Sequence, residues 1–300
     1  MRAGGARCAF LCVPLDWQTC AVRQSSGPYD ESTIAFATMH GKDLLARDAF
    51  RETLGAEVIA VGGLDTDQFG TFTGDIARTL APKAAALAKA RLGMQLAHTP
   101  YGLASEGSFS SPMGLLVEHH EVLVFVDDNH GLELVEAKLS TSPVPSAMTV
   151  TTVNAALRWA TAAGFPHQRL VIRAGELGDT IVKGIDTPDE LQGRIEAFLD
   201  AGTRVVIEPD YRAHQCPSRA SVITTLAERM ALRLATTCEQ CGTPGFGQVD
   251  LERGLPCEYC GERTDVVAAQ IKGCAGCTFT ERVARAEQFA PARWCDSCNP

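Results

Sequence analysis

The sequence predicts an α/β fold with a mostly parallel or mixed sheet flanked by helices, followed by a C-terminal double zinc ribbon. Two observations support this prediction. Residues 29–235 alternate short apolar runs with amphipathic helical segments, the order expected of a chain that builds a parallel sheet. Residues 236–300 hold eight of the twelve cysteines, arranged as four CxxC pairs. We therefore expect an α/β domain and a paired four-cysteine zinc-ribbon domain, preceded by a variable extension over residues 1–28.

The first half of the expected α/β domain contains three strands and two helices. An apolar run at 33–39 predicts a buried strand, and the helix after it ends at Gly55. A second strand, 57–61, leads through a Gly-, Thr- and Asp-rich loop to a helix with Pro82 in its first turn, where proline is tolerated. The third strand is YGLAS at 101–105. This alternation makes a parallel sheet the default expectation.

A hairpin then interrupts the alternation. Two apolar runs, 121–128 and 132–140, flank Asn129-His130-Gly131, which is a hairpin signal. Strands and helices alternate again after it. We expect a helix at 149–164, strands at 169–174 and 179–185, a helix at 187–202, a strand at 203–210 and a helix at 220–235.

The overall charge and the hydropathy limit the kind of partner. The chain has a formal net charge of −9 and a hydrophobic content of 45%, as expected for an ordinary acidic globular protein. Binding to nucleic acid needs Lys and Arg contacts to phosphates, so this charge argues against nucleic acid as a partner. No apolar run is long enough to cross a membrane, and Asp16 ends the short run after Arg7 without a cleavage site. We expect a cytoplasmic protein with no membrane partner.

The four CxxC pairs predict two zinc sites. Intervals of 15, 13 and 17 residues separate the pairs, and a CxxC turn places two thiolates at one edge of a zinc tetrahedron. No histidine follows His214, so both sites must be all-cysteine. The expected ligands are Cys238, Cys241, Cys257, Cys260, Cys274, Cys277, Cys295 and Cys298.

Disulfides, a redox dithiol and iron–sulfur ligation are the alternatives to zinc. We expect sequential pairing, the first CxxC with the second and the third with the fourth, rather than an interleaved cross-brace. Four thiolates leave no open coordination position, which favours structural zinc over catalytic zinc. Residues 236–300 carry nine acidic and six basic side chains, so a protein partner is a better candidate for the ribbons than nucleic acid.

A ligand site is expected at the carboxyl ends of the strands, where open α/β sheets bind ligands. Polar residues collect there in this sequence. The candidate catalytic residues are His40, Asp67 and Glu106. The candidates for binding phosphate or another ligand group are Lys42, Thr71, Thr73, Arg78, Ser108, Arg173, Asp210 and Arg212.

Each of these candidates has a plainer alternative. Lys42 begins a helix, where a cation would reinforce anion binding, or it is a solvated lysine beside a capping glycine. Asp65 and Asp67 are candidate Mg²⁺ ligands together with Glu106, or the two aspartates cap their own turn. His40 is a general base, a phosphate donor or a structural group. Asp210 begins a charged stretch that either binds a ligand or forms salt bridges. His119, His120 and His130 are expected at the surface.

Four motifs resemble an uncharacterised bacterial family built on a domain of unknown function. They are FATMHGKD, LDTDQFGTFTGDIART, ASEGSF and the pair CEQCGTPGFG with GLPCEYCG. The resemblance covers about residues 30–300. It implies no activity, and it implies a start near Tyr29, which agrees with treating residues 1–28 as an extension.

The order of the first elements is also similar to that of the inosine-triphosphate pyrophosphatase-like hydrolases. This resemblance implies phosphate binding by cations and Mg²⁺ binding by carboxylates; the residues here would be Lys42, Arg78, Lys83, Asp67 and Glu106. The turn MHGKD and the loop DTDQFGTFTG depart from the motifs of those enzymes.

Two functions follow from these observations. The first is Mg²⁺-assisted hydrolysis or transfer on a phosphorylated small molecule such as a nucleotide. The alternative is a non-enzymatic module that binds a ligand or a protein and uses zinc only as structure. The sequence contains no GxSxG elbow, no GxGxxG loop and no complete Walker A loop.

Overall fold

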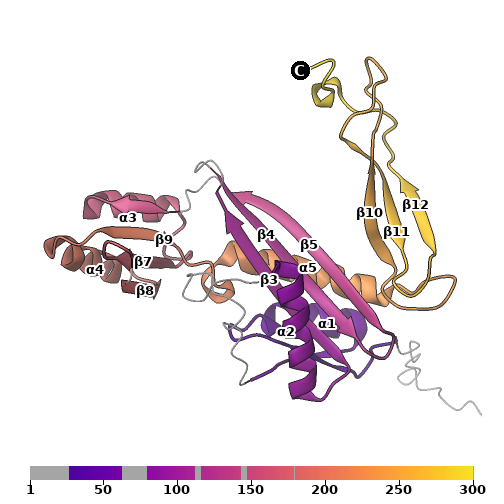
Figure 1. Ribbon diagram of the computed structural model, residues 1–300, viewed down its shortest axis with the longest axis horizontal. Helices are drawn as coiled ribbons and strands as arrows, with labels where there is room; N and C mark the ends of the chain where they lie inside the picture. Colours follow the sequence, from indigo (N-terminus) through magenta and orange to yellow (C-terminus); the bar gives the residue numbers. More distant parts are fainter. Residues whose placement is uncertain (1–26, 63–79, 112–115, 143–146, 179, 300) are drawn as a thin grey trace, which may run out of the picture.

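The computed structural model describes residues 27–62, 80–111, 116–142, 147–178 and 180–299. These residues form three β-sheets and five α-helices (Figure 1). The α/β class and the mixed sheet agree with the prediction from sequence. In the part of the chain that the structure describes, no helix is both long and apolar enough to cross a membrane.

The first sheet has five strands in the order β2-β1-β3-β4-β5. Strand β1 pairs in parallel with β2 and β3, whereas β3, β4 and β5 form an antiparallel meander. The predicted hairpin is its last turn, and Gly131 adopts the left-handed conformation that the turn needs. The strands are β1 (Thr33–Phe36), β2 (Glu57–Ala60), β3 (Tyr101–Ser110), β4 (Val117–Asp127) and β5 (Leu132–Ser142).

Three helices cover the two faces of this sheet (Figure 1). Helices α1 (Asp43–Leu54) and α5 (Pro217–Ala235) pack on one face, where Phe50, Phe125 and Met230 share a hydrophobic cluster. Helix α2 (Pro82–Ala97) packs on the other face through a cluster that is mainly Ala, Val and Met. Side chains of β3 and β4 alternate between the two clusters, because successive residues of a strand point to opposite faces.

The second sheet is antiparallel and has its own core. Its order is β6-β9-β7-β8, and α3 and α4 pack beside it (Figure 1). No helix separates β7 from β8; Gly175 and Gly178, both with positive φ, form the turn between them. The elements are β6 (Met148–Val150), α3 (Val153–Ala162), β7 (Leu170–Ala174), β8 (Thr180–Ile185), α4 (Pro188–Asp200) and β9 (Val205–Pro209).

The cysteine-rich region forms the third sheet, which projects away from the first (Figure 1). It is an antiparallel meander of β10 (Gly247–Arg253), β11 (Val267–Gly273) and β12 (Thr280–Ala284). Its few buried apolar side chains include Phe246 and Leu255. The pairing of β10 with β11 brings Gly247 opposite Gly273 at one end and Arg253 opposite Val267 at the other.

Candidate functional site

The eight cysteines of the CxxC pairs form two tetrads. Within each tetrad the four sulfur atoms lie within 4.8 Å of one another. In the first tetrad the Sγ–Sγ distances are 3.8 Å for Cys238–Cys277 and 3.5 Å for Cys241–Cys274. A zinc ion with Zn–S bonds of about 2.3 Å separates its ligand sulfurs by roughly 3.8 Å. The second tetrad has similar spacing, 3.9 Å for Cys257–Cys298 and 3.5 Å for Cys260–Cys295. Both tetrads therefore fit a tetrahedral metal ion.

The pairing of the CxxC motifs is interleaved, and the expectation of sequential pairing was wrong. The first motif joins the third, and the second joins the fourth. The reason lies in the meander: Cys241 precedes β10 and Cys274 follows β11, so both lie at one end of the sheet. Cys257 follows β10 and lies at the opposite end, where the chain after β12 supplies Cys295. A metal in each tetrad would therefore clamp one end of the sheet.

The CxxC turns prepare the sulfur atoms for a metal. Gly242 and Gly261 follow the second cysteine of their motifs with φ of 71° and 75°, a left-handed conformation that glycine adopts readily. Backbone N–H groups donate to the sulfurs, for example from Tyr259 to Cys257 Sγ at 3.4 Å. Hydrogen bonds from the backbone of Cys260 and Tyr259 lower the pKa of the Cys257 thiol to about 7. At Cys257 the turn thus favours the thiolate, which is the form that binds metal.

A second group of functional side chains lies at the carboxyl ends of β1 and β3. Strand β1 ends at Phe36. The last backbone hydrogen bond from this segment to β3 is donated by Ala37 N to Leu103 O at 3.1 Å. The next β3 carbonyl that points the same way, Ser105 O, accepts a bond from Lys42 Nζ at 2.9 Å. The lysine therefore replaces a backbone donor where β1 has ended, and this anchors its ammonium group in the sheet.

Two buried ion pairs surround Lys42, and we call the five charged groups the polar centre. Lys89 of α2 pairs with Glu106 of β3, and both side chains are less than a tenth exposed. Arg219 of α5 makes two bonds to Glu121 of β4, from Nε to Oε2 at 2.9 Å and from the terminal NH2 group to Oε1 at 3.0 Å. The described residues of the polar centre comprise three cations and two carboxylates.

Burial and neighbouring charges shift the pKa values of Lys42 and Glu121 in the polar centre. Burial, reinforced by Arg219, lowers the pKa of Lys42 to about 8, although Glu121 and Glu106 oppose this shift. Burial alone would raise the pKa of Glu121, but Arg219 and a hydrogen bond from His119 outweigh it and hold that pKa well below its usual value. Lys42 has no carboxylate within ion-pair distance among the described residues.

Close packing fixes the ion pair beneath Lys42. A Cβ atom added to Gly107 of β3 would collide with the carboxylate of Glu121 and approach the Arg219 guanidinium at 2.9 Å. Arg219 also donates to Tyr211 O at 2.7 Å. Position 107 therefore needs glycine, because any side chain there would displace the Glu121 carboxylate or the Arg219 guanidinium.

His40 lies beside the turn that leads into α1 and stacks on His214, with ring centroids 4.9 Å apart and planes inclined by 29°. Burial, followed by the nearby Arg212, lowers the pKa of His214. The neutral form of His214 is therefore favoured at pH 7, and neutral imidazole can accept a proton.

The predicted site residues thus separate into several groups. Lys42 and Glu106 meet in the polar centre, but Glu106 is engaged by Lys89. Asp210 and Arg212 form an ion pair at 2.6 Å. This contact is the salt bridge that was the alternative to ligand binding for the charged stretch after Asp210. Arg173 lies in the second sheet and pairs with Glu208 at 2.8 Å, and Ser108 is half-buried on β3. Asp67, Thr71, Thr73 and Arg78 lie outside the described residues.

Some site residues were missed or misplaced by sequence reasoning. His119 is buried rather than on the surface, and its Nε2 lies 2.9 Å from Glu121 Oε2. Glu121 was not singled out, although a glutamate at the start of the apolar run EVLVFV is itself a signal of a buried pair. Lys89 and Arg219 carry no such signal, because charged residues on helices usually face solvent.

Among the described residues, no group of three or more metal-ligating side chains includes a carboxylate. The two cysteine tetrads are the groups of three or more metal-ligating side chains found in the described ranges. Asp65 and Asp67, the other candidate ligands, lie outside those ranges.

Comparison with curated proteins finds no match, so no relative supports the likeness to inosine-triphosphate pyrophosphatases. The model of one family, described as Domain of unknown function (DUF6671), matches residues 89–300. The matched segment includes Glu106, Glu121, Arg219 and both cysteine tetrads, and it leaves Lys42 outside. The chain belongs to the DUF6671 family.

Proposed function

We propose that the protein binds a phosphorylated small molecule at the polar centre, on a scaffold that two zinc ions stabilise. The observation that carries the proposal is the position of Lys42. Its ammonium group is partly desolvated, held by Ser105 O, and without a carboxylate partner in the described part of the chain. A phosphate group would supply a negative charge beside this ammonium group, whose pKa is lowered by burial and by the nearby Arg219.

Two neighbouring groups support an anion at this position. Ser105 Oγ is buried and has no hydrogen-bond partner among the described residues, and Lys42 contacts the backbone carbonyl of the same residue. Lys42 is also the N-cap of α1, whose first N–H groups and dipole favour negative charge. Phosphate is the common biological anion that can accept from an ammonium, a hydroxyl and backbone N–H groups together.

Hydrolysis or transfer of the phosphoryl group is the second candidate function, and the His40–His214 stack favours it. A neutral histidine beside a phosphate site can take a proton from an attacking water or hydroxyl. The described carboxylates of the polar centre are already paired with cations, so they serve to position Lys89 and Arg219.

Zinc at the two tetrads has a structural role in this proposal. Each tetrad offers four thiolates and no open position, and the third sheet buries few large apolar side chains. Metal binding would then supply much of the folding free energy of this region. Metal analysis should find two zinc ions per chain, and a chelator should unfold residues 236–300 while the first sheet stays folded.

The binding proposal is tested with a Lys42→Met variant and a matched Lys272→Met control. Lys272 lies on β11 and pairs only loosely, at 3.9 Å, with Glu281. A thermal-shift screen of nucleoside and sugar phosphates should find a compound that stabilises the native protein and Lys272→Met, and titration should show that Lys42→Met binds it at least tenfold more weakly. If no phosphorylated compound stabilises the native protein, or Lys42→Met binds as tightly, the proposal is wrong.

The enzymatic candidate has a separate readout. Phosphate release from the bound compound, with Mg²⁺ supplied, should fall at least tenfold in His214→Asn while the dissociation constant stays within about threefold, because His214 is the neutral imidazole of the stack and general-base catalysis contributes about 10² or more to rate. Binding without turnover would leave the binding proposal standing and remove the enzymatic one.

A further inference from the structure

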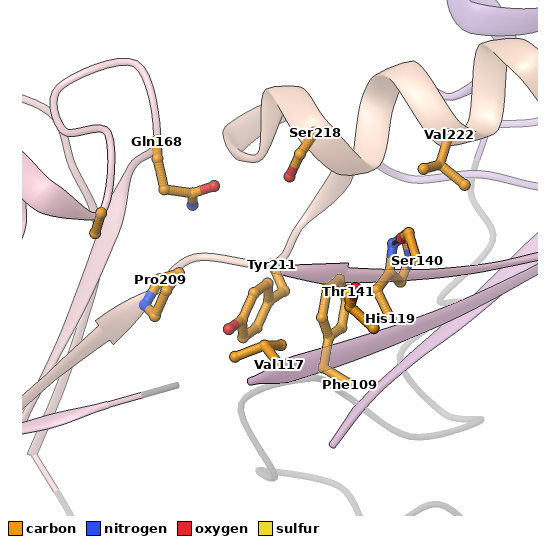
Figure 2. Close-up of a pocket in the computed structure, with 11 residues that line it drawn as sticks. Phe109, Val117, His119, Ser140, Thr141, Gln168, Pro209, Tyr211, Ser218 and Val222 are labelled. Atoms are coloured by element: carbon orange, nitrogen blue, oxygen red, sulfur yellow. Dashed lines mark hydrogen bonds between the residues drawn. The ribbon is translucent and has the colours of Figure 1, made fainter. Parts of the chain in front are cut away.

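A cavity of about 310 Å³ lies between the first and second sheets (Figure 2). Strands β3, β4 and β5 line one side; Ala163, Gln168 and Pro209 line the other; residues of α5 and the segment before it complete the wall. The two sheets have separate hydrophobic clusters, so the cavity lies at a junction between two packed units. Junctions of this kind are common places for small-molecule sites, and the volume is sufficient for a small organic ligand.

Three aromatic rings form a parallel stack in the wall of this cavity. The Phe109 ring lies 4.2 Å from the His119 ring at 1° and 3.8 Å from the Tyr211 ring at 17°, measured between centroids. Figure 2 shows Pro209, Tyr211 and Phe109 following one another across the cavity. Parallel rings from three separate segments present a flat surface that needs no rearrangement to receive a further ring.

The stack is held rigidly from behind. His119 Nε2 faces the buried carboxylate of Glu121 at 2.9 Å, and Arg219, which pairs with the same carboxylate, lies 6.0 Å above the Phe109 ring. The other ring nitrogen of His119, Nδ1, lies 3.4 Å from the hydroxyl oxygen of Ser140. This contact places the Ser140 hydroxyl at the cavity wall.

The lining of the cavity combines apolar and aromatic side chains with hydroxyl groups. None of its described residues is Lys, Arg, Asp or Glu, and it combines Val117, Val222 and the aromatic rings with a few hydroxyl groups. Thr141 and Ser218 are the exposed members and so mark the opening. Burial raises the pKa of Tyr211, which keeps its hydroxyl protonated and able to donate a hydrogen bond. A charged group would be poorly solvated here, whereas a flat uncharged ring would match the wall.

We propose that this cavity binds an uncharged planar aromatic or heteroaromatic ring, stacked on Tyr211 and hydrogen-bonded to the hydroxyl groups that line it. The site is independent of the phosphate site proposed at Lys42, because it rests on the cavity and the stack alone.

The experiment uses adenosine as an uncharged planar probe and ribose as its non-planar control. Saturation-transfer NMR on the zinc-loaded full-length protein should show transfer to the base protons of adenosine and none to ribose. Loss of one stacked ring typically weakens binding by about fivefold or more, so Tyr211→Leu should raise the dissociation constant of adenosine by at least that factor. The matched control is Tyr259→Leu, which removes a ring that is 83% exposed in the cysteine-rich region.

A second measurement covers the case in which Tyr211→Leu does not fold. The chain has four tyrosines, so ¹³C-tyrosine labelling gives a small set of ring signals. Intermolecular NOEs should connect the adenosine base to the Tyr211 ring and not to Tyr259. The proposal is overturned if neither adenosine nor indole binds the folded protein at millimolar concentration, if Tyr211→Leu binds as tightly as the native chain, or if the NOEs reach other tyrosines instead.

Discussion

Replacement of Arg219 by methionine should destabilise the first sheet more than any surface substitution. The Arg219 side chain is 1% exposed and that of Glu121 is fully buried, and two bonds at 2.9 Å and 3.0 Å join them. Breaking a buried pair of this kind costs about 3–5 kcal/mol, because the remaining charge is left without compensation. The carbonyl of Tyr211 loses its donor as well, which adds about 1 kcal/mol. The total is a large part of a typical folding free energy of about 5–15 kcal/mol.

Urea denaturation of zinc-saturated protein, followed by circular dichroism, measures this effect. Arg282→Met is the matched control, because Arg282 makes the same two-bond contact to Glu252 at 2.7 Å and 2.9 Å on the exposed face of the third sheet. That control should leave the urea midpoint nearly unchanged. The double variant Arg219→Met/Glu121→Met should cost clearly less than the sum of the single variants. If the single effects simply add, the two side chains do not interact and the description of the polar centre is wrong.

The pH dependence gives an independent check on the same pair. The folded-state pKa of Glu121 is held below its ordinary value of 4.5, so its contribution to stability is fully present above that value and is lost as the pH falls through the folded-state pKa. In Arg219→Met, burial should instead raise the pKa of Glu121, so protonation would relieve the buried charge. The stability difference between native protein and variant should therefore shrink from pH 7 to pH 5; a constant difference would contradict the reasoning.

Two further predictions follow from the structure. Interleaved pairing predicts that Cys238→Ser/Cys274→Ser retains one zinc ion per chain by metal analysis and that Cys238→Ser/Cys257→Ser retains none; the reverse result would restore sequential pairing. The pKa of Lys42 is lowered from 10.5 to about 8, so the unfolded chain binds more protons between these values and stability should rise with pH across that window. Lys42→Met should lack this part of the rise in urea titrations at pH 8 and pH 10, and an equal rise in both proteins would contradict the assignment.

Local patterns were sufficient to predict most elements of the fold. Gly55 ends α1 in the left-handed conformation, Pro82 begins α2, and the turn around Gly131 joins β4 to β5, each as its residue type suggests. The direction of pairing in the second sheet was harder to predict. Strand–helix alternation suggested parallel strands, but β7 and β8 are joined by a glycine turn too short for a crossover, and the sheet is antiparallel.

The pairing of the cysteines shows a different limit of sequence reasoning. The CxxC spacing identifies the ligands, because it reflects the geometry of a single turn. Which turns share a metal depends on how many strands lie between them. One strand separates Cys241 from Cys257, which places these motifs at opposite ends of the sheet, whereas two antiparallel strands return the chain to Cys274. Without β10 and β11 assigned as strands, both pairings satisfy the spacing equally well.

The polar centre changes the chemistry that the sequence suggested for the strand ends. The rule that ligands bind at those ends drew attention to Lys42 and Glu106, and it suggested a carboxylate that holds Mg²⁺. In the structure Glu106 forms an ion pair with Lys89, and Glu121 forms one with Arg219. These two cations lie on helices, and the sequence alone could not predict which strand residues the helices face. With both described carboxylates paired to cations, Lys42 is the cation of the polar centre that has no described carboxylate within ion-pair distance. This arrangement supports the proposal of direct anion binding over binding through a metal held by these carboxylates.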